Sequence, residues 1–298
     1  MSRTVKDWII ATRPWSFPAS VTPILVTVAY IFYLSHTAGV EMNWTNAVLS
    51  FFLLVFLHAG GNLVSDYYDH IKGVDKVNGP NGVTWIHAGI FQPKEILHYG
   101  YALLGVAIVI GLAILLNSSF TAIWLGVAGL LLTSCYPWLK AHALGDLDVL
   151  LGFALLPAVG VSFVTTGAYH WETMLLSLPF GLITVAILHA NNTRDIENDL
   201  GAGLNTLSIS LGVKTCQVLY LVLLVLPYIL IAFYFVNGLV PVWSFLPFFT
   251  IPIAVKNCGL MLPRNGQPQI ATLDQQTAQL QMLFGLLFTA SFIIAALV

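Results

Sequence analysis

Charged residues are scarce in this sequence. Asp, Glu, Lys and Arg make up 8% of the 298 residues, whereas 58% are hydrophobic and the mean hydropathy is +0.85. Ordinary soluble domains do not have this composition. The 11 Lys and Arg residues form no basic stripe of the kind that binds nucleic acid. The composition therefore predicts an integral membrane protein that lies in a lipid bilayer and has no nucleic-acid partner.

Cysteine and low-complexity sequence are also nearly absent. The three cysteines, Cys135, Cys216 and Cys258, form no CxxC pair, so neither a disulfide framework nor a zinc site is indicated, and we interpret them as packing residues. No Ser/Pro-rich linker interrupts the apolar runs, which favours a single domain over residues 1–298. The first apolar run is broken by prolines and lacks a cleavage site of small residues, so no removable signal peptide is predicted.

The apolar runs predict an all-α membrane protein. A helix needs about 20 apolar residues to cross a bilayer, and nine segments of this kind can be found. They lie near residues 15–35, 46–65, 96–116, 120–139, 149–168, 173–190, 215–236, 241–260 and 278–298. The eighth contains three prolines, which predicts a kinked, short or partly interfacial segment.

The basic residues predict the orientation of these spans. All 11 Lys and Arg residues fall in the amino-terminal segment or in the connections after the second, fourth, sixth and eighth spans. Positive charge marks the cytoplasmic side of a membrane protein. The amino terminus is therefore predicted inside and the carboxyl terminus outside, in the inner membrane of a bacterium. Eleven of the 13 acidic residues share the inner side, although topology does not require it.

A motif of one Asn and two Asp residues occurs twice, after the second and after the sixth span. Its members are Asn62, Asp66 and Asp69 in the first copy, and Asn191, Asp195 and Asp199 in the second. Residues three and four positions apart lie on one face of a helix, so each copy predicts a small oxygen cluster. Both spans run from outside to inside, so the repeat is parallel and both clusters face the cytoplasmic side.

Crowded carboxylates at a membrane boundary need a cation between them. Oxygen ligands suit Mg²⁺, which binds one or two protein carboxylates together with phosphate oxygens. The two clusters therefore predict Mg²⁺ and a diphosphate substrate. The alternative is two solvated acidic helix ends that only cap their spans.

Further candidate residues lie beside the motifs. Lys72 and Arg194 could bind phosphate oxygens, and the glycine-bearing loops that follow both motifs let backbone N–H groups approach such oxygens. Tyr136 and Lys140 end the fourth span on the motif side, where a diphosphate or an aromatic substrate needs partners. The alternatives are turns, topology signals and interfacial belt residues. His58 and His189 lie inside spans 2 and 6, as buried hydrogen-bonded residues or as cavity linings.

Taken together, these segments resemble the UbiA superfamily of intramembrane aromatic prenyltransferases. The resemblance rests on Asn62-x-x-x-Asp66-Tyr-Tyr-Asp69, on Asn191-Asn-x-Arg-Asp195, on Tyr136-Pro-x-x-Lys140 and on the nine spans. Within the superfamily, the sequence is most like the branch that prenylates 1,4-dihydroxy-2-naphthoate in menaquinone biosynthesis. The opening Arg13-Pro-Trp-Ser-Phe-Pro is similar too, so the resemblance spans the chain.

The resemblance implies a helical fold around a central cavity that is open to the cytoplasmic side and laterally to lipid. It implies Mg²⁺-dependent transfer of a polyprenyl group from polyprenyl diphosphate to an aromatic acceptor. By position, the metal residues would be Asn62, Asp66, Asp69, Asp195 and Asp199, with the four Asp residues catalytic, and the substrate contacts would be Lys72, Tyr136, Lys140, Asn191, Asn192 and Arg194.

Two departures from the superfamily pattern bear on the substrates. His70 replaces the last Asp of the first motif of the 4-hydroxybenzoate branch, which speaks against that branch, and Leu204 replaces a lysine found in many relatives. Other acceptors within the superfamily remain an alternative. A secondary transporter would place its acids nearer the membrane midplane, and a CDP-alcohol phosphatidyltransferase would carry an Asp-Gly-x-x-Ala-Arg signature that is missing here.

Overall fold

The computed structural model describes residues 3–71, 85–201, 203–262 and 270–298, and every regular element in these ranges is helical. The long helices are α2 (Pro18–Thr37), α3 (Trp44–Ile71), α4 (Pro93–Leu116), α5 (Ile123–Ala141), α8 (Glu172–Arg194), α11 (Val213–Val236) and α13 (Leu273–Leu297). Two composite segments are α6 (Gly145–Leu150), η3 (Leu151–Leu155) and α7 (Leu156–Thr166), and η4 (Val242–Thr250) with α12 (Ile251–Met261). Short helices are α1 (Val5–Ala11), η1 (Pro14–Ser16), η2 (Phe120–Ala122), α9 (Ile196–Gly201) and α10 (Leu207–Leu211).

All nine predicted spans are helical in the described part of the chain. Eight are long and apolar enough to cross a membrane, and the remaining one, Phe120–Tyr136, is a shorter apolar helix. The prediction of an all-α membrane fold with about nine spans is confirmed. Apolar side chains are abundant on the outside of the bundle, for example Ile108 and Val109 on α4 and Val218 on α11, as expected of helices that face lipid.

The eighth span has the irregular geometry that its prolines predicted. Its first half, η4, is a 3₁₀-helix of nine residues with Pro247 in its interior, and Pro252 lies in the first turn of α12. Proline has no N–H and its ring collides with the preceding turn. The tighter 3₁₀ form, which is uncommon at this length, therefore replaces an α-helix until Ile251.

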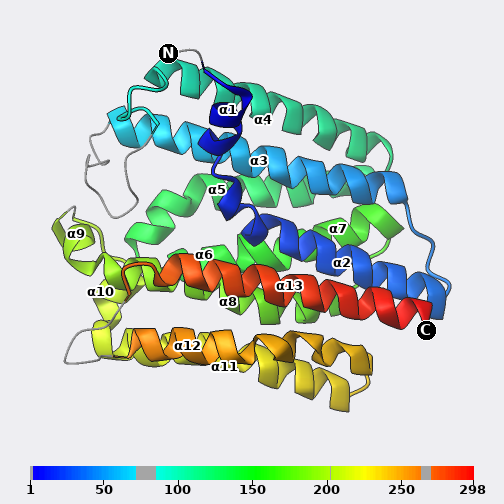
Figure 1. Cartoon of the computed structure of the whole chain (residues 1–298). Helices are drawn as coiled ribbons and strands as arrows, with labels where there is room; N and C mark the ends of the chain where they lie inside the picture. Colours follow the sequence, from blue (N-terminus) through cyan, green and yellow to red (C-terminus); the bar gives the residue numbers. More distant parts are fainter. Residues whose placement is uncertain (1–2, 72–84, 202, 263–269) are drawn as a thin grey trace.

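The helices pack in layers that can be followed in Figure 1. Helix α3 packs chiefly against α4, α2 lies against α13, and α8 lies between α11 and α13. Glycine permits the two closest approaches. A Cβ atom at Gly181 would lie 2.6 Å from Cβ of Ala154, and one at Gly285 would overlap Thr22. Small residues at helix contacts are how membrane helices gain packing energy without a hydrophobic driving force.

The two motif-bearing helices end at the same end of the bundle. Helices α3 and α8 both run toward the end where α9 and α10 lie, and the carboxyl terminus lies at the opposite end (Figure 1). The two motifs are therefore at equivalent ends of parallel helices, as the repeat predicted.

Candidate functional site

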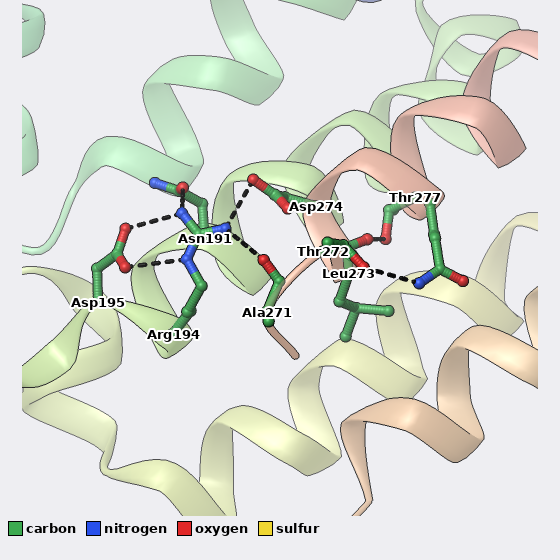
Figure 2. Close-up of polar contacts among 9 residues, drawn as sticks. Asn191, Arg194, Asp195, Ala271, Thr272, Leu273, Asp274 and Thr277 are labelled. Atoms are coloured by element: carbon green, nitrogen blue, oxygen red, sulfur yellow. Dashed lines mark hydrogen bonds and ion pairs between the residues drawn. The ribbon is translucent and has the colours of Figure 1, made fainter. Parts of the chain in front are cut away.

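The second motif is organised around the guanidinium group of Arg194 (Figure 2). Nε donates to Oδ1 of Asp195 at 3.0 Å and Nη2 donates to Oδ2 of the same carboxylate at 3.0 Å, which is a bidentate fork. Nη2 also donates to Oδ1 of Asn191, while Nη1 donates to Oδ2 of Asp274 at 2.9 Å and to the carbonyl oxygen of Ala271 at 3.4 Å. Arg194 thus ties the end of α8 to the start of α13.

Asp199 lies beyond this fork, on α9. Its backbone N–H donates to the carbonyl oxygen of Asp195 at 2.8 Å, and its carbonyl oxygen accepts from the N–H of Leu204 at 3.0 Å. Burial raises the pKa of the Asp199 carboxyl above its ordinary value, the ammonium group of Lys140 opposes the rise, and the carboxylate of Asp195 adds to it. The predicted residues Asp195, Asp199 and Lys140 therefore share one electrostatic environment.

The first motif is held by the segment between α1 and α2. Asp66 is buried and forms an ion pair with Arg13. The amide Nδ2 of Asn62 donates to the carbonyl oxygen of Thr12 at 3.0 Å and to Oγ of Ser16 at 3.1 Å. The predicted neighbours Asn62 and Asp66 thus contact a segment about 50 positions away.

The local backbone explains how Arg13 reaches this position. Arg13 adopts a left-handed conformation, with φ 56° and ψ 57°, immediately before Pro14 opens η1. Proline disfavours the right-handed helical conformation in the residue before it, so α1 ends and the chain turns. His58, one turn before Asn62, fixes the far side of this turn, because its Nε2 lies 3.1 Å from Oγ of Ser16 and its Nδ1 lies 2.7 Å from Oγ of Ser20.

A third polar group lies between α5, α6 and α8. Nδ1 of His189 is 2.9 Å from Oδ2 of Asp146, and Nε2 donates to the carbonyl oxygen of Cys216 at 3.1 Å. The predicted residue Tyr136 is within electrostatic range of Asp148, Asp146 and Asp199. Both histidines of the sequence analysis are therefore hydrogen-bonded residues, and both stand next to a motif.

Some predicted site residues are outside what the structure describes. Lys72 falls in the undescribed segment 72–84, and the side chain of Asp69 is not described although its backbone belongs to α3. Asn192 is buried, with its Oδ1 lacking a hydrogen-bond partner among the described residues. Of the cysteines, Cys216 is buried as expected of a packing residue, whereas Cys135 is exposed.

Three residues of the site were not singled out from the sequence as site residues. Arg13 enters the sequence analysis only as a basic residue and as part of the opening segment, and Asp146 and Asp274 do not enter it. A sequence signal existed for Asp146, because two acids in Gly145-Asp-Leu-Asp148 occur near the end of an apolar span. No local signal could have joined Asp274 to Arg194, 80 positions earlier.

The oxygen chemistry of the site fits Mg²⁺. In the described ranges no three His, Cys, Asp or Glu side chains form a ready cage for a metal ion. Mg²⁺ does not require one, because it takes few protein carboxylates and completes its shell with water and phosphate oxygens. Among described residues, one carboxylate oxygen each of Asp199 and Asp274 is buried without a hydrogen-bond partner. Such oxygens are costly unless a donor or cation meets them.

The family comparison decides what kind of protein carries this site. Residues 23–273 match the model of the UbiA prenyltransferase family. The chain belongs to the UbiA prenyltransferase family. Membership confirms the expected prenyltransferase, and it sets aside the transporter and CDP-alcohol phosphatidyltransferase alternatives.

Relatives from animals match along nearly the whole chain. UbiA prenyltransferase domain-containing protein 1 homolog of Drosophila melanogaster is 33% identical, over 96% of this chain and 79% of the relative. UbiA prenyltransferase domain-containing protein 1 of Homo sapiens is 32% identical, over 97% of this chain and 84% of the relative.

Solved structures of UbiA homologs have the same fold. A homolog from Aeropyrum pernix K1 superposes with a TM-score of 0.67 at 17% identity, over 92% of this chain and 97% of that chain. A homolog from Archaeoglobus fulgidus bound to DMAPP and Mg²⁺ superposes with a TM-score of 0.60 at 16% identity, over 95% of this chain and 99% of that chain.

Proposed function

We propose that this protein transfers a polyprenyl group from polyprenyl diphosphate to an aromatic acceptor, and that the acceptor is 1,4-dihydroxy-2-naphthoate. In the direct product, demethylmenaquinol, the prenyl group would replace the carboxyl group of the acceptor, which leaves as CO2 while diphosphate leaves the donor. A separate two-electron oxidant would then give demethylmenaquinone. One observation carries the proposal: two Asn–Asp motifs stand at equivalent ends of the parallel helices α3 and α8, and an arginine is paired with the first Asp of each. Paired acidic clusters with accompanying cations suit a diphosphate that must be bound and then released as an anion.

Mg²⁺ is the proposed cofactor, and the Archaeoglobus fulgidus homolog bound to DMAPP and Mg²⁺ supports this choice. The residues that would hold it are Asn62, Asp66 and Asp69 in the first cluster, and Asp195 and Asp199 in the second. When bound, Mg²⁺ would offset the negative charge that accumulates on the leaving diphosphate.

The arginines and Lys140 would complete the charge balance of the diphosphate site. The Arg194 side chain is only 11% exposed and is fixed by five hydrogen bonds to described residues, so its planar guanidinium is already oriented. Arg13 keeps its side chain 35% exposed beside a carboxylate that is 5% exposed. Both arginines can donate to phosphate oxygens while they stay close to their carboxylate partners. Lys72 and Asn191 are the further proposed contacts of the diphosphate.

An apolar groove supplies a place for the prenyl tail. It has a volume of about 380 Å³ and lies between α2, α3 and α13, lined by residues such as Phe17, Val55 and Leu286. Its Phe17 end adjoins the first motif, because Phe17 follows Ser16 and its ring centroid is 5.5 Å from that of His58. A tail in this groove would exclude water from the allylic carbon, which protects a cationic intermediate from hydrolysis.

A prenylation assay tests the proposal directly. The purified protein in lipid nanodiscs is incubated with a labelled polyprenyl diphosphate, Mg²⁺ and one of two acceptors, 1,4-dihydroxy-2-naphthoate or 4-hydroxybenzoate. We expect demethylmenaquinol or its oxidised form, stoichiometric release of diphosphate, and loss of both on chelation of Mg²⁺. Turnover with 4-hydroxybenzoate alone would assign another acceptor within the family. Absence of product with every acceptor and donor length would contradict the proposed reaction.

We also propose that the motif end of the bundle faces the cytoplasm of a bacterium, which rests on the one-sided distribution of basic residues. Cysteine-free protein carrying Leu200→Cys on α9 or Asn117→Cys at the opposite end separates the two faces. An impermeant thiol reagent should label Asn117→Cys in intact cells, and should label Leu200→Cys only after the membrane is opened. The reverse pattern would contradict the orientation.

A further inference from the structure

The polar group formed by His189, Asp146 and Asp148 is not used by the diphosphate chemistry described above. His189 is fully buried, and Asp146 and Asp148 are 7% and 5% exposed. Asp146 and Asp148 each have a buried Oδ1 atom without a hydrogen-bond partner in the part of the chain that the structure describes. Buried carboxylate oxygens normally have partners, so this group is built to receive one.

The His189–Asp146 pair is electrically neutral. The carbonyl oxygen of Cys216 and the carboxylate of Asp146 are both acceptors, so the two contacts of the His189 ring require one proton in addition to that of a neutral imidazole. That proton belongs to the pair, whichever partner holds it. Asp146 is thereby oriented without adding net charge, and its Oδ1 and the Oδ1 of Asp148 are both left as acceptors without a partner among the described residues. A hydroxyl donor suits this arrangement.

The position of the group fits the second substrate. Asp146 contacts His189 on α8, and Asn192 with its buried, partnerless Oδ1 lies one turn farther along the same helix. The segment that carries Asp146 and Asp148 continues into η3, a π-helix, whose Phe153 ring lies 5.9 Å from the ring of His58. The segment from α6 to η3 therefore reaches from the second motif to the neighbourhood of the first. Isolated π-helical turns in α-helices are frequently found at functional sites.

We propose that Asp146 and Asp148 form a subsite that accepts a hydrogen bond from a phenolic hydroxyl of the acceptor, with His189 as the residue that positions Asp146. The inference rests on the proposed function and adds the recognition of the acceptor to it. A hydroxyl that donates to a carboxylate gains electron density, and this density is shared with the neighbouring ring carbon, which is the atom that must attack the prenyl cation. The carboxylate of the acceptor points away from the subsite, because like charges repel.

The test combines a protein change with a substrate change. Asp148→Asn keeps the size of the side chain but removes its charge, and mono-O-methyl ethers of the acceptor each remove one hydroxyl donor. With the wild-type protein, kcat/KM for one of the two ethers should be about ten- to a hundredfold lower than for the normal acceptor. Asp148→Asn should lose a similar factor with the normal acceptor, at an unchanged donor KM, and should lose little more with that ether. Strong coupling of this kind identifies two partners of one contact.

The matched control is Glu172→Gln, which also replaces a carboxylate by an amide. Glu172 starts α8, at the end of this helix that lies away from His189 and the second motif. Glu172→Gln should leave the kcat/KM of every acceptor unchanged. If the kcat/KM losses caused by Asp148→Asn and by each ether multiply, the two changes act independently. That result would contradict the subsite but not the proposed prenyl transfer. A raised Mg²⁺ requirement with an unchanged acceptor KM would instead assign Asp148 to a cation and overturn the proposal. Absence of wild-type turnover would overturn this inference together with the proposed function.

His189 needs a separate test because its removal could unfold the protein. His189→Asn retains a side-chain donor near the position of Nδ1, whereas His189→Leu retains none. Equilibrium binding of the acceptor, measured by calorimetry without donor or Mg²⁺, should weaken about tenfold in His189→Leu and recover most of this loss in His189→Asn. Equal weakening in both variants, at equal thermal stability, would contradict the positioning role.

Discussion

The two acidic clusters of this protein use the same residue types but are assembled differently. In the second cluster, Asn191, Arg194 and Asp195 are neighbours in the chain, whereas Asp274 and the carbonyl oxygen of Ala271 come from the segment that starts α13. In the first cluster, the cation for Asp66 is Arg13, which lies 53 positions earlier on a separate segment. Each cluster thus has one arginine on the first Asp of its motif, but only one cluster carries that arginine inside the motif.

The difference indicates which cluster depends on distant structure. Arg194 has contacts to Asp195, Asn191, Asp274 and the carbonyl oxygen of Ala271, so the second cluster is fixed at both ends of its guanidinium (Figure 2). The first cluster depends on the turn at Arg13 and on the hydrogen bonds of Asn62 to Thr12 and Ser16. We therefore expect the second cluster to be rigid before substrates bind and the first to follow the position of the amino-terminal segment.

The largest expected effect comes from removing a motif carboxylate. Asp195→Asn keeps the shape of the side chain but removes a proposed metal ligand, so turnover should fall by at least about a hundredfold, corresponding to several kcal/mol of lost charge stabilisation. Asp66→Asn in the first cluster should behave alike. Steady-state assays at increasing Mg²⁺ concentration measure the turnover of both variants.

Asp274→Asn is the matched control, because Asp274 shares Arg194 with Asp195 but lies outside the motif. Asp274→Asn should lower turnover by less than about tenfold. Near-normal turnover of Asp195→Asn at ordinary Mg²⁺ concentrations would contradict the two-cluster model, and equal losses in both variants would show that the charge balance of Arg194 matters rather than the motif.

Removing Arg194 should affect donor binding and stability together. Arg194→Ala leaves Asp195 and Asp274 without their shared cation, which costs about 3 kcal/mol for a buried pair, and it removes a donor to the diphosphate. We expect a lower thermal unfolding temperature in detergent and a donor KM raised about ten- to a hundredfold. Arg194→Lys should restore part of the stability but little of the donor KM, because lysine lacks the bidentate fork.

Removing Arg13 should weaken activity more than stability. The Arg13 side chain is 35% exposed and forms an ion pair with Asp66, so Arg13→Ala should lower the unfolding temperature less than Arg194→Ala does. Turnover should still fall about tenfold, since the first cluster loses the guanidinium group that is paired with Asp66. Measuring both variants side by side tests the comparison. A larger loss of stability for Arg13→Ala would reverse our assignment of the rigid cluster.

The smallest effect is expected at Leu204. The family resemblance leads us to expect lysine at this position. The backbone N–H of Leu204 donates to the carbonyl oxygen of Asp199 at 3.0 Å, so a lysine side chain would start close to the second cluster. Because Arg194 and Lys140 already supply charge there, Leu204→Lys should change the donor KM less than about threefold. Activity that appears only in Leu204→Lys would contradict this compensation and indicate a diverged relative with another substrate.

The sequence by itself determined the membrane fold and predicted the two oxygen clusters. Hydropathy is a property of each segment alone, so all nine helical segments could be found without knowing their neighbours. The spacing of Asn62 and Asp66 follows from helical periodicity, since both lie on α3, whereas Asp195 caps the end of α8 and Asp199 lies on the separate helix α9. Arg194 could be assigned to the site because it lies inside its motif.

Only the tertiary structure decided which distant residues complete the site. Arg13 meets Asp66, Asp274 meets Arg194 and Asp146 meets His189 over separations of 53, 80 and 43 positions. None of these pairs has a local pattern, because a charged residue near a span end looks the same whether it signals topology, faces water or pairs across the bundle. Helix packing decides between these roles, since a buried charge is stable only where another element brings its partner.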